Sequence, residues 1–274
     1  MPHTPALHQH ASFYKFVELD DPDGVAAILR ELTLKLSGLI LVAGEGINGT
    51  VAGSDEGVSG FEHALTHDPR LHGRFEGMVF KLSGGKTAPF ARMKVHCKSE
   101  IVALGVEGVT ATAERDTHVS PQAWRELIAQ DNVVVIDNRN TFEFRLGKFK
   151  NAIDPKVSHF RDFPDYVHAN APDWKAAGQK VAMYCTGGIR CEKTSAWMQS
   201  LGLDVYQLDG GILNFFQTLP DADQDWEGEC FVFDNRIALD THLQETDTTA
   251  EDVYQDDPDD QWRLRRAKRL DGSL

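Results

Sequence analysis

The chain has 274 residues, of which 41% are hydrophobic and 26% are charged, a composition typical of a globular protein with room for two domains. It contains no run of eighteen apolar residues and no basic N-terminal segment followed by an apolar one, so we expect no membrane-spanning helix, no secretory signal and a cytoplasmic location. The net charge of −14 at pH 7 argues at first against a nucleic-acid partner.

The negative charge is concentrated near the C-terminus. Eight acidic residues and no Lys or Arg lie in the segment 245–260, which leaves a net charge of −6 on the rest of the chain. The negative net charge therefore comes largely from one segment and bears on solubility. It does not exclude a local basic surface elsewhere on the protein.

The chain has four cysteines, at positions 97, 185, 191 and 230. They form no C-x-x-C pair and match no common zinc spacing, so we expect neither a disulfide framework nor a metal site. At least one of these thiols is instead a candidate for chemistry.

The first hundred residues predict a small α+β domain. Short strand-like segments and two segments of helical spacing follow one another in the order β-α-β-β-α-β, which is typical of a ferredoxin-like sandwich. We place this domain at residues 1–108. The expected strands are 13–17, 39–43, 50–52, 78–82 and 95–104, a turn-rich segment covers 44–49, and the expected helices are 21–36 and 54–68.

A polar linker at 110–117 precedes a second pattern, in which strands alternate with helices. Such alternation predicts a parallel α/β sheet, and we place this domain at residues 117–220. The expected strands are 133–137, 182–184 and 205–208, and the expected helices are 120–129, 191–201 and 212–219.

The remaining residues, 221–274, form a C-terminal extension in which the periodicity fades. Residues 230–233 are one more strand or a packed extension. The acidic segment 245–260 has few apolar residues, so we expect it to be disordered. Residues 262–270 form a short basic amphipathic piece.

The loop 185–190 carries the strongest chemical signal in the chain. Cys185 lies at the carboxyl end of a predicted strand and before a helix, where α/β proteins keep their sites. Backbone N–H groups of Thr186, Gly187, Gly188 and Ile189, the positive end of the helix and the Arg190 guanidinium would all favour a thiolate, which is the nucleophilic form of cysteine.

The alternative interpretation of Cys185 is a buried structural cysteine, and the Gly-Gly pair followed by Arg190 disfavours it. Cys191 begins the expected helix, so it is either a resolving thiol beside Cys185 or a structural residue, and we favour the structural role. Protein-tyrosine phosphatases use Cys-x5-Arg, whereas the spacing here is Cys-x4-Arg, so phosphatase chemistry is disfavoured.

Several motifs together resemble a known family. The segments 137–139, 147–153 and 184–193, together with Glu143, resemble a rhodanese domain. More narrowly, the chain resembles the rhodanese-containing tRNA uridine-34 5-hydroxylases, because GEGINGT (44–50), FARMKV (90–95) and KSEIVALG (98–105) are similar to that family's N-terminal domain. Segment 228–234 is similar to the part that follows its rhodanese domain, so the resemblance covers roughly residues 13 to 240.

The resemblance implies oxygen-dependent hydroxylation of the wobble uridine to 5-hydroxyuridine. It implies tRNA, through its anticodon loop, as the partner, molecular oxygen as co-substrate and an essential cysteine that maps onto Cys185. No metal or organic cofactor is evident from the sequence. Two departures are the absence of the cysteine-rich C-terminal extension of many members and Lys148 in place of the histidine of typical rhodaneses.

Other residues give weaker signals. Asp137 and Arg139 lie at a predicted strand end and are candidates for an accessory role at the site. The favoured interpretation is structural, an ion pair that holds the bases of the neighbouring loops together. Five basic residues cluster in sequence in the N-terminal domain and are candidates for tRNA phosphate contacts, with a solvated face as an equal alternative. They are Lys81, Lys86, Arg92, Lys94 and Lys98.

Residue chemistry alone leaves two other functions open. The same loop would serve a sulfurtransferase that carries a persulfide on Cys185. A non-catalytic rhodanese fold used for binding is the third possibility, because a fold does not fix a function.

Overall fold

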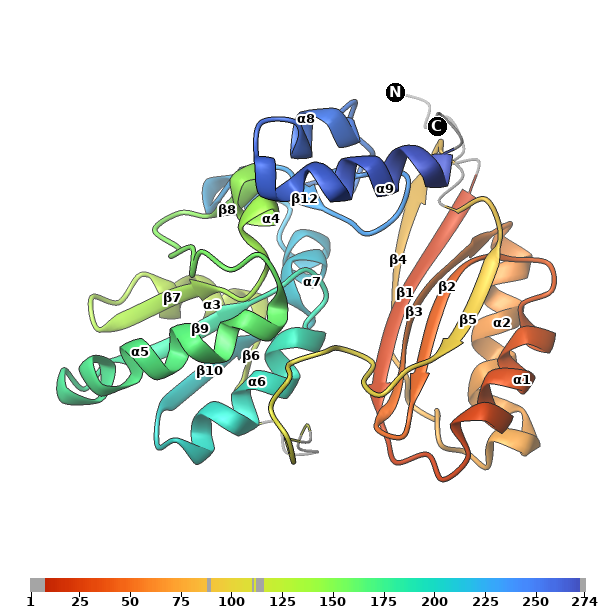
Figure 1. Ribbon diagram of the computed structural model, residues 1–274, viewed down its shortest axis with the longest axis horizontal. Helices are drawn as coiled ribbons and strands as arrows, with labels where there is room; N and C mark the ends of the chain where they lie inside the picture. Colours follow the sequence, from red (N-terminus) through yellow and green to blue (C-terminus); the bar gives the residue numbers. More distant parts are fainter. Residues whose placement is uncertain (1–7, 88–89, 110, 112–115, 272–274) are drawn as a thin grey trace.

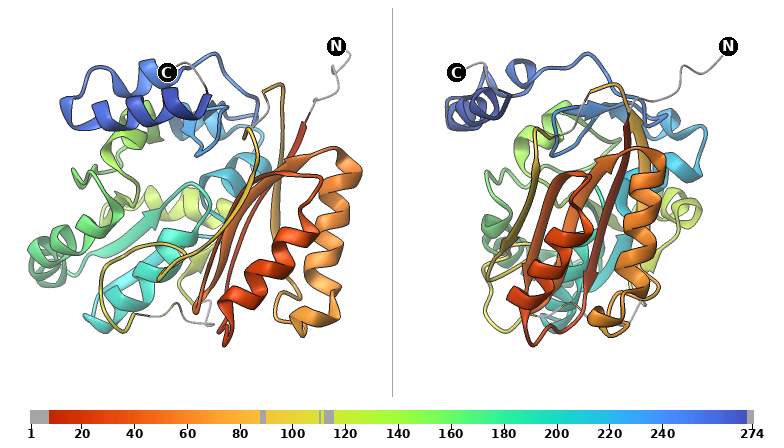
Figure 2. Two further views of the ribbon diagram at one scale, coloured as in Figure 1. Left: turned by 45° about the vertical axis from the view of Figure 1, so that its right-hand side comes forward. Right: turned by 90° about the vertical axis from the view of Figure 1, so that its right-hand side faces the viewer.

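The computed structural model of the protein describes residues 8–87, 90–109, 111 and 116–271. Two sheet-containing domains lie side by side, and a C-terminal segment packs at one end of the second domain (Figures 1 and 2). None of the helices in the described part of the chain combines the length and the hydrophobicity needed to span a bilayer.

The N-terminal domain is a five-stranded sheet with two helices on one face. The order β4-β1-β3-β2 is the ferredoxin-like arrangement that the sequence predicts, and β5 is added beside β2 as a parallel edge strand. Its elements are β1 (His8–Phe16), α1 (Pro22–Leu32), β2 (Ser37–Ala43), β3 (Gly46–Gly53), α2 (Asp55–His67), the 3-10 helix η1 (Pro69–Leu71), β4 (Phe80–Gly85) and β5 (Met93–Cys97).

Alternation along the strands decides which residues face the second domain. In β1, Ala11 and Phe13 are buried in the core beneath α1 and α2. Ser12 and Tyr14 therefore point away from the helices. They lie on the sheet face that is turned toward the second domain in Figure 1. The uncovered face of this sheet is thus available to form part of a site.

Two expectations for this domain are wrong in their limits. The turn-rich segment 44–49 is only a two-residue turn, because β3 already pairs with β2 from Gly46 onward. The expected strand 95–104 ends at Cys97, and the chain then leaves the sheet edge toward the second domain. The backbone N–H of Ile101 donates to the Glu45 carboxylate at 2.7 Å, which holds this irregular segment against the β2–β3 turn.

The second domain has a four-stranded sheet in the order β6-β10-β9-β7. Every pair is parallel, which confirms the parallel sheet predicted from the sequence, and β6 is a strand that the sequence-based expectations lack. Its elements are β6 (His118–Val119), α3 (Pro121–Ile128), β7 (Val133–Asp137), α4 (Thr141–Leu146), β8 (Gly147–Phe149), η2 (Phe160–Asp162), α5 (Phe163–Ala176), β9 (Lys180–Tyr184), α6 (Ile189–Ser200), β10 (Asp204–Leu208) and α7 (Gly211–Thr218).

Helices cover both faces of this sheet. Trp124 of α3 and Phe215 of α7 belong to the core on one face, whereas Phe163 of α5 and Trp197 of α6 belong to the core on the other. Helix α5 is absent from the sequence-based expectations. Its buried residues follow helical spacing, but Pro172 in its interior and its many polar residues obscure the pattern.

The C-terminal extension is ordered, contrary to the disorder expected for 245–260. It contains η3 (Ala222–Gln224), β11 (Trp226–Gly228), β12 (Cys230–Phe231), β13 (Ala238–Leu239), α8 (Ala250–Tyr254), η4 (Pro258–Asp260) and α9 (Gln261–Asp271). Val253 and Tyr254 pack with Phe142, and Asp257 and Asp260 pair with Arg145 at 2.5 and 2.7 Å. Residues of the second domain thus provide the apolar contacts and the opposite charge that the acidic segment itself lacks.

Candidate active site between the two domains

Cys185 follows β9 directly, and its loop ends at the first turn of α6. Gly188 has φ +99°, a conformation that favours glycine, and it occupies the N-cap position of α6. This conformation turns the Gly188 N–H toward Cys185, and it donates to Sγ at 3.1 Å. One of the loop N–H groups expected to form the cradle therefore contacts this sulfur.

The carbonyl side of the loop is fixed by α7. The N–H groups of Ile212 and Leu213 donate to the carbonyl oxygens of Cys185 and Thr186 at 3.0 and 3.1 Å. Gly211, with φ +69°, allows this approach, because a Cβ there would lie 2.4 Å from the Cys185 oxygen. The first turn of α7 therefore helps to fix the conformation of the Cys185 loop.

We expect Gly211→Ala to destabilise the protein and distort the loop. The left-handed backbone alone costs an alanine about 1–2 kcal/mol, and the clash with Cys185 adds to that. Thermal unfolding should show a lower midpoint than for Gly187→Ala, whose added Cβ meets nothing within 4 Å. Equal midpoints for the two variants would contradict this role of Gly211.

Arg190 does not act as an isolated charge beside the sulfur. Its guanidinium forms two hydrogen bonds with the Glu143 carboxylate, at 2.8 and 2.9 Å, and both side chains are buried. Glu143 lies in the first turn of α4 and also accepts from the Asn140 N–H at 3.1 Å. Glu143 is among the residues that resemble a rhodanese domain, but 47 residues separate it from Arg190, so the sequence does not predict their ion pair.

The surroundings of Cys185 favour its thiolate. Burial is the largest influence and opposes ionisation, but hydrogen bonds from the Cys191 thiol and from the backbone N–H groups of Cys191 and Arg190, together with the Arg190 charge, outweigh it and lower the pKa to about 6. Burial and the neighbouring Cys185 raise the pKa of Cys191, which therefore stays protonated and donates. Cys191 is thus both a packed helix residue and a partner of the reactive sulfur.

Alkylation by iodoacetamide should follow this ionisation. We expect the rate at Cys185 to rise with pH through about 6 and to level off above it, since the thiolate is the reacting form. Exposed Cys97, whose pKa is raised by desolvation and by Asp23, should react only in more alkaline solution. Cys191→Ala should move the Cys185 midpoint upward, and an unmoved midpoint, read by peptide mass spectrometry, would contradict the thiol hydrogen bond.

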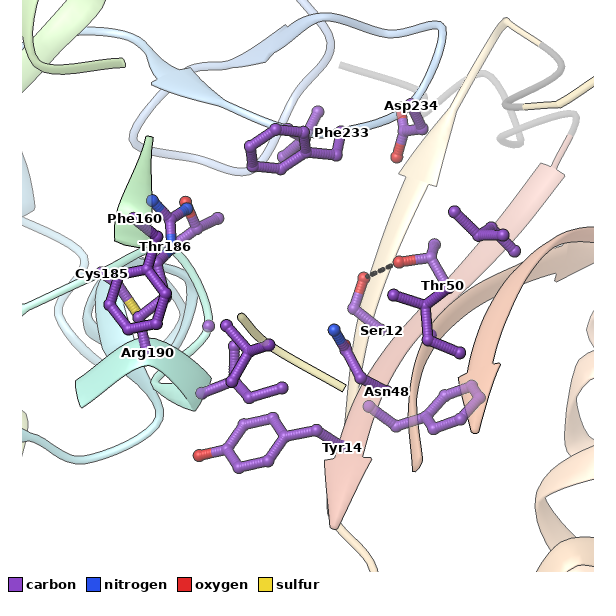
Figure 3. A pocket seen from close by; sticks show the side chains of 18 of the residues that line it. Ser12, Tyr14, Asn48, Thr50, Phe160, Cys185, Thr186, Arg190, Phe233 and Asp234 are labelled. Carbon is purple, nitrogen blue, oxygen red and sulfur yellow. Dashed lines mark hydrogen bonds between the residues drawn. The ribbon is translucent and has the colours of Figure 1, made fainter. Parts of the chain in front are cut away.

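The loop opens into a cavity of about 450 Å³ between the two domains. Figure 3 shows Cys185, Thr186 and Arg190 on one side of it, Ser12, Tyr14, Asn48 and Thr50 of the N-terminal sheet on the opposite side, and Phe233 and Asp234 of the C-terminal extension nearby. Thr186, Gly187, Ile189 and Arg190 line it together with Cys185. The site is therefore built from all three parts of the chain.

The accessory candidates Asp137 and Arg139 lie beneath this cavity and do not line it. They form a fully buried ion pair at 2.7 Å, and Arg139 also donates to the Gly147 oxygen at 2.6 Å. This geometry fits the favoured structural interpretation of the pair.

The structure divides the five basic candidates between two sheet edges. Lys81 lies on edge strand β4, lines the cavity and stands 4.9 Å from the centre of the Tyr14 ring. Lys86 follows the same strand, and its backbone N–H donates to Glu245 at 2.8 Å. Arg92, Lys94 and Lys98 lie on or beside β5, at the opposite edge.

Sequence reasoning missed the residues of the N-terminal sheet that line the cavity. Their signal is the period-two pattern of polar residues, Ser12 and Tyr14 in β1 and Asn48 and Thr50 in β3, each alternating with core residues. That pattern marks a strand face that is not core, but only the packing of the two domains turns it into the wall of a site. In the described ranges, no group of three or more His, Cys, Asp or Glu side chains is arranged to hold a metal ion.

Comparisons with known proteins agree with this architecture. Residues 8–101 match the family model of the UPF0176 acylphosphatase like domain, and residues 120–218 match that of the rhodanese-like domain. A rhodanese-related protein from Thermoplasma volcanium is similar to 36% of the chain over 90% of its own length, at 22% identity, with a TM-score of 0.28. A rhodanese-like domain protein from Staphylococcus aureus is similar to 36% of the chain over 90% of its own length, at 20% identity, with a TM-score of 0.30. These two partial similarities carry no argument about function.

The fold and the cysteine loop define a two-domain rhodanese protein in which Cys185 faces an acylphosphatase-like domain across the cavity. The tRNA uridine(34) hydroxylase of Legionella pneumophila (strain Corby) is 44% identical over 236 residues, which are 85% of this chain and 91% of that protein. The one from Anaplasma marginale (strain St. Maries) is 45% identical over 85% of this chain and 83% of its own. The chain belongs to the tRNA uridine(34) hydroxylase family.

Proposed function

We propose that this protein hydroxylates uridine 34 of tRNA at C5, with molecular oxygen as co-substrate and Cys185 as the catalytic residue. Its relatives are named for hydroxylation of that uridine, which disfavours the sulfurtransferase and binding-module alternatives. The observation that carries the proposal is the position of Cys185, on a cavity of about 450 Å³ closed on its far side by a second domain. Cavities of about 300–1,000 Å³ accept small ligands, and a nucleobase is of that class.

The residues of the cavity have roles suited to such a substrate. The loop holds the Cys185 sulfur as a thiolate, the form that acts as a nucleophile toward the ring or as the sulfur that is oxidised. Phe160 and Phe233 line the cavity, and Phe233 is 58% exposed, so these rings can stack on an extruded base. A wobble base is already in a single-stranded loop, so its entry requires no opening of a duplex.

Phosphate contacts are proposed for Lys81 beside the cavity and for Lys86, Arg92, Lys94 and Lys98 at the two sheet edges. These positions are suited to an RNA backbone that passes over the cavity between the edges. We therefore also propose a cytoplasmic location, where tRNA is available.

Isotope labelling tests the reaction. Expression of the full chain in a host strain that lacks its own routes to 5-hydroxyuridine should restore this nucleoside in tRNA, measured by nucleoside mass spectrometry. Growth under ¹⁸O₂ should place the heavy isotope in the new hydroxyl group. Oxygen derived from water, or no 5-hydroxyuridine at all, would overturn the proposal.

A further inference from the structure

The wall of the cavity opposite Cys185 presents side chains in rows across the N-terminal sheet. Strand register aligns Lys81, Ser12, Thr50 and Leu39 in one row. It aligns Tyr14, Asn48, Leu41 and His96 in the next. Asn48 and Thr50 are two residues apart on β3, so their side chains stand on the same face of the sheet.

The side-chain amide of Asn48 is oriented. Its Nδ2 donates to the Ile101 carbonyl oxygen at 3.1 Å, and its Oδ1 accepts no hydrogen bond from any residue in the described parts of the chain. Rotation of the amide by half a turn would place two oxygen atoms against each other. Asn48 lines the cavity, so its Oδ1, which has no partner among the described residues, is an acceptor for a molecule bound there. Rotation of the amide would break the hydrogen bond to Ile101.

A partly buried network holds this orientation and connects it to the helix that starts at the catalytic loop. The Ile101 N–H donates to Glu45 at 2.7 Å, and the Lys193 ammonium binds the same carboxylate at 2.9 and 3.1 Å and also contacts Glu100. Lys193 belongs to α6 and is 1% exposed. The position of Asn48 is thus tied to that of the Cys185 loop.

The neighbouring hydroxyl groups supply a donor. Ser12 Oγ and Thr50 Oγ1 lie 2.9 Å apart, and one donates to the other (Figure 3). That contact uses one of the two hydroxyl protons, so the second remains able to donate to a molecule in the cavity.

An acceptor next to a donor is complementary to the N3–H and the adjacent carbonyl of uracil. Cytosine has an unprotonated N3 in this position, and its lone pair would face the Asn48 oxygen. We propose that Asn48, together with the Ser12–Thr50 hydroxyl pair, reads the base and selects uracil over cytosine. The inference rests on the proposed function for the identity of the substrate, and it assigns base selection to the domain that does not carry the nucleophile.

A measurement of RNA binding tests base selection independently of the hydroxylation reaction. The full chain with Cys185→Ser is titrated with anticodon stem-loop RNAs that carry uridine, cytidine or 3-methyluridine at position 34, and affinity is read by fluorescence anisotropy. The parent should prefer uridine by about tenfold to a hundredfold, since cytidine and 3-methyluridine both lack the N3–H. Addition of Asn48→Ala should remove most of this preference.

His96→Ala is the matched control. His96 lies in the same row as Asn48 but on exposed edge strand β5, and it does not line the cavity, so the preference for uridine should persist. If Asn48→Ala impairs folding, the comparison of the three RNAs on the parent still tests whether the N3–H is read.

Equal binding of uridine and cytidine by the parent, or an undiminished preference in the folded Asn48→Ala variant, would overturn the inference. Such a result would leave the proposed function standing wherever the wild-type protein forms 5-hydroxyuridine. Conversely, an inactive wild-type protein whose preference for uridine is lost in Asn48→Ala would overturn the proposed function and support base reading by Asn48.

Discussion

Replacement of Cys185 by serine should abolish the formation of 5-hydroxyuridine. The groups that stabilise a thiolate here cannot ionise a serine hydroxyl, whose proton is held far more tightly, so neither a nucleophile nor an oxidisable sulfur remains. Loss of a residue that carries the chemistry costs on the order of 10³-fold or more in rate. Nucleoside mass spectrometry of tRNA from complemented cells should therefore find none of the modified base.

Cys97→Ser is the control for this prediction. Cys97 is the exposed cysteine at the end of β5, away from the cavity, and its replacement should leave the modification level unchanged. The loss in Cys185→Ser must also occur without a large change in stability, because serine is close in size to cysteine and its hydroxyl oxygen can accept hydrogen bonds from the same donors. Persistent 5-hydroxyuridine in a folded Cys185→Ser protein would exclude the catalytic role.

Replacement of Asp137 by asparagine should strongly lower the free energy of unfolding of the protein. Asp137 and Arg139 are both 0% exposed, and the carboxylate accepts from the Arg139 backbone N–H, Nε and Nη2 at 3.0, 2.9 and 2.7 Å. Removal of one partner of a buried pair leaves the other charge without compensation, at about 3–5 kcal/mol. Chemical denaturation should show this decrease as a lower midpoint.

The chain contains a natural control with the same local geometry. In the sequence Asp68-Pro69-Arg70, the carboxylate accepts from the Arg70 backbone N–H, Nε and Nη2 at 2.9, 3.0 and 2.8 Å, but the Arg70 side chain is 47% exposed. Asp68→Asn should leave the midpoint almost unchanged, because water solvates the arginine that loses its partner. Similar losses in both variants would show that local hydrogen bonds, rather than burial, determine the effect.

Local signals made the second domain and its loop predictable. The apolar segment 133–137 coincides with β7, and the glycines before α6 mark a turn that few other residues can adopt. Helix α5 and the ordered acidic segment escaped prediction for the opposite reason. Pro172 interrupts the periodicity of α5, and the acids at 257 and 260 are ordered by Arg145, more than 100 residues away.

The sequence by itself determined that Cys185 sits in an anion-stabilising loop at the end of a parallel strand, because strand, glycine turn and helix start are neighbours along the chain. Its motifs also indicated the family. Only the tertiary structure decided what faces that sulfur. The pairing of Glu143 with Arg190, the separation of the basic residues to two sheet edges and the placement of Asn48 opposite Cys185 all depend on strand register and domain packing. These contacts join residues far apart in sequence, and no local preference encodes them.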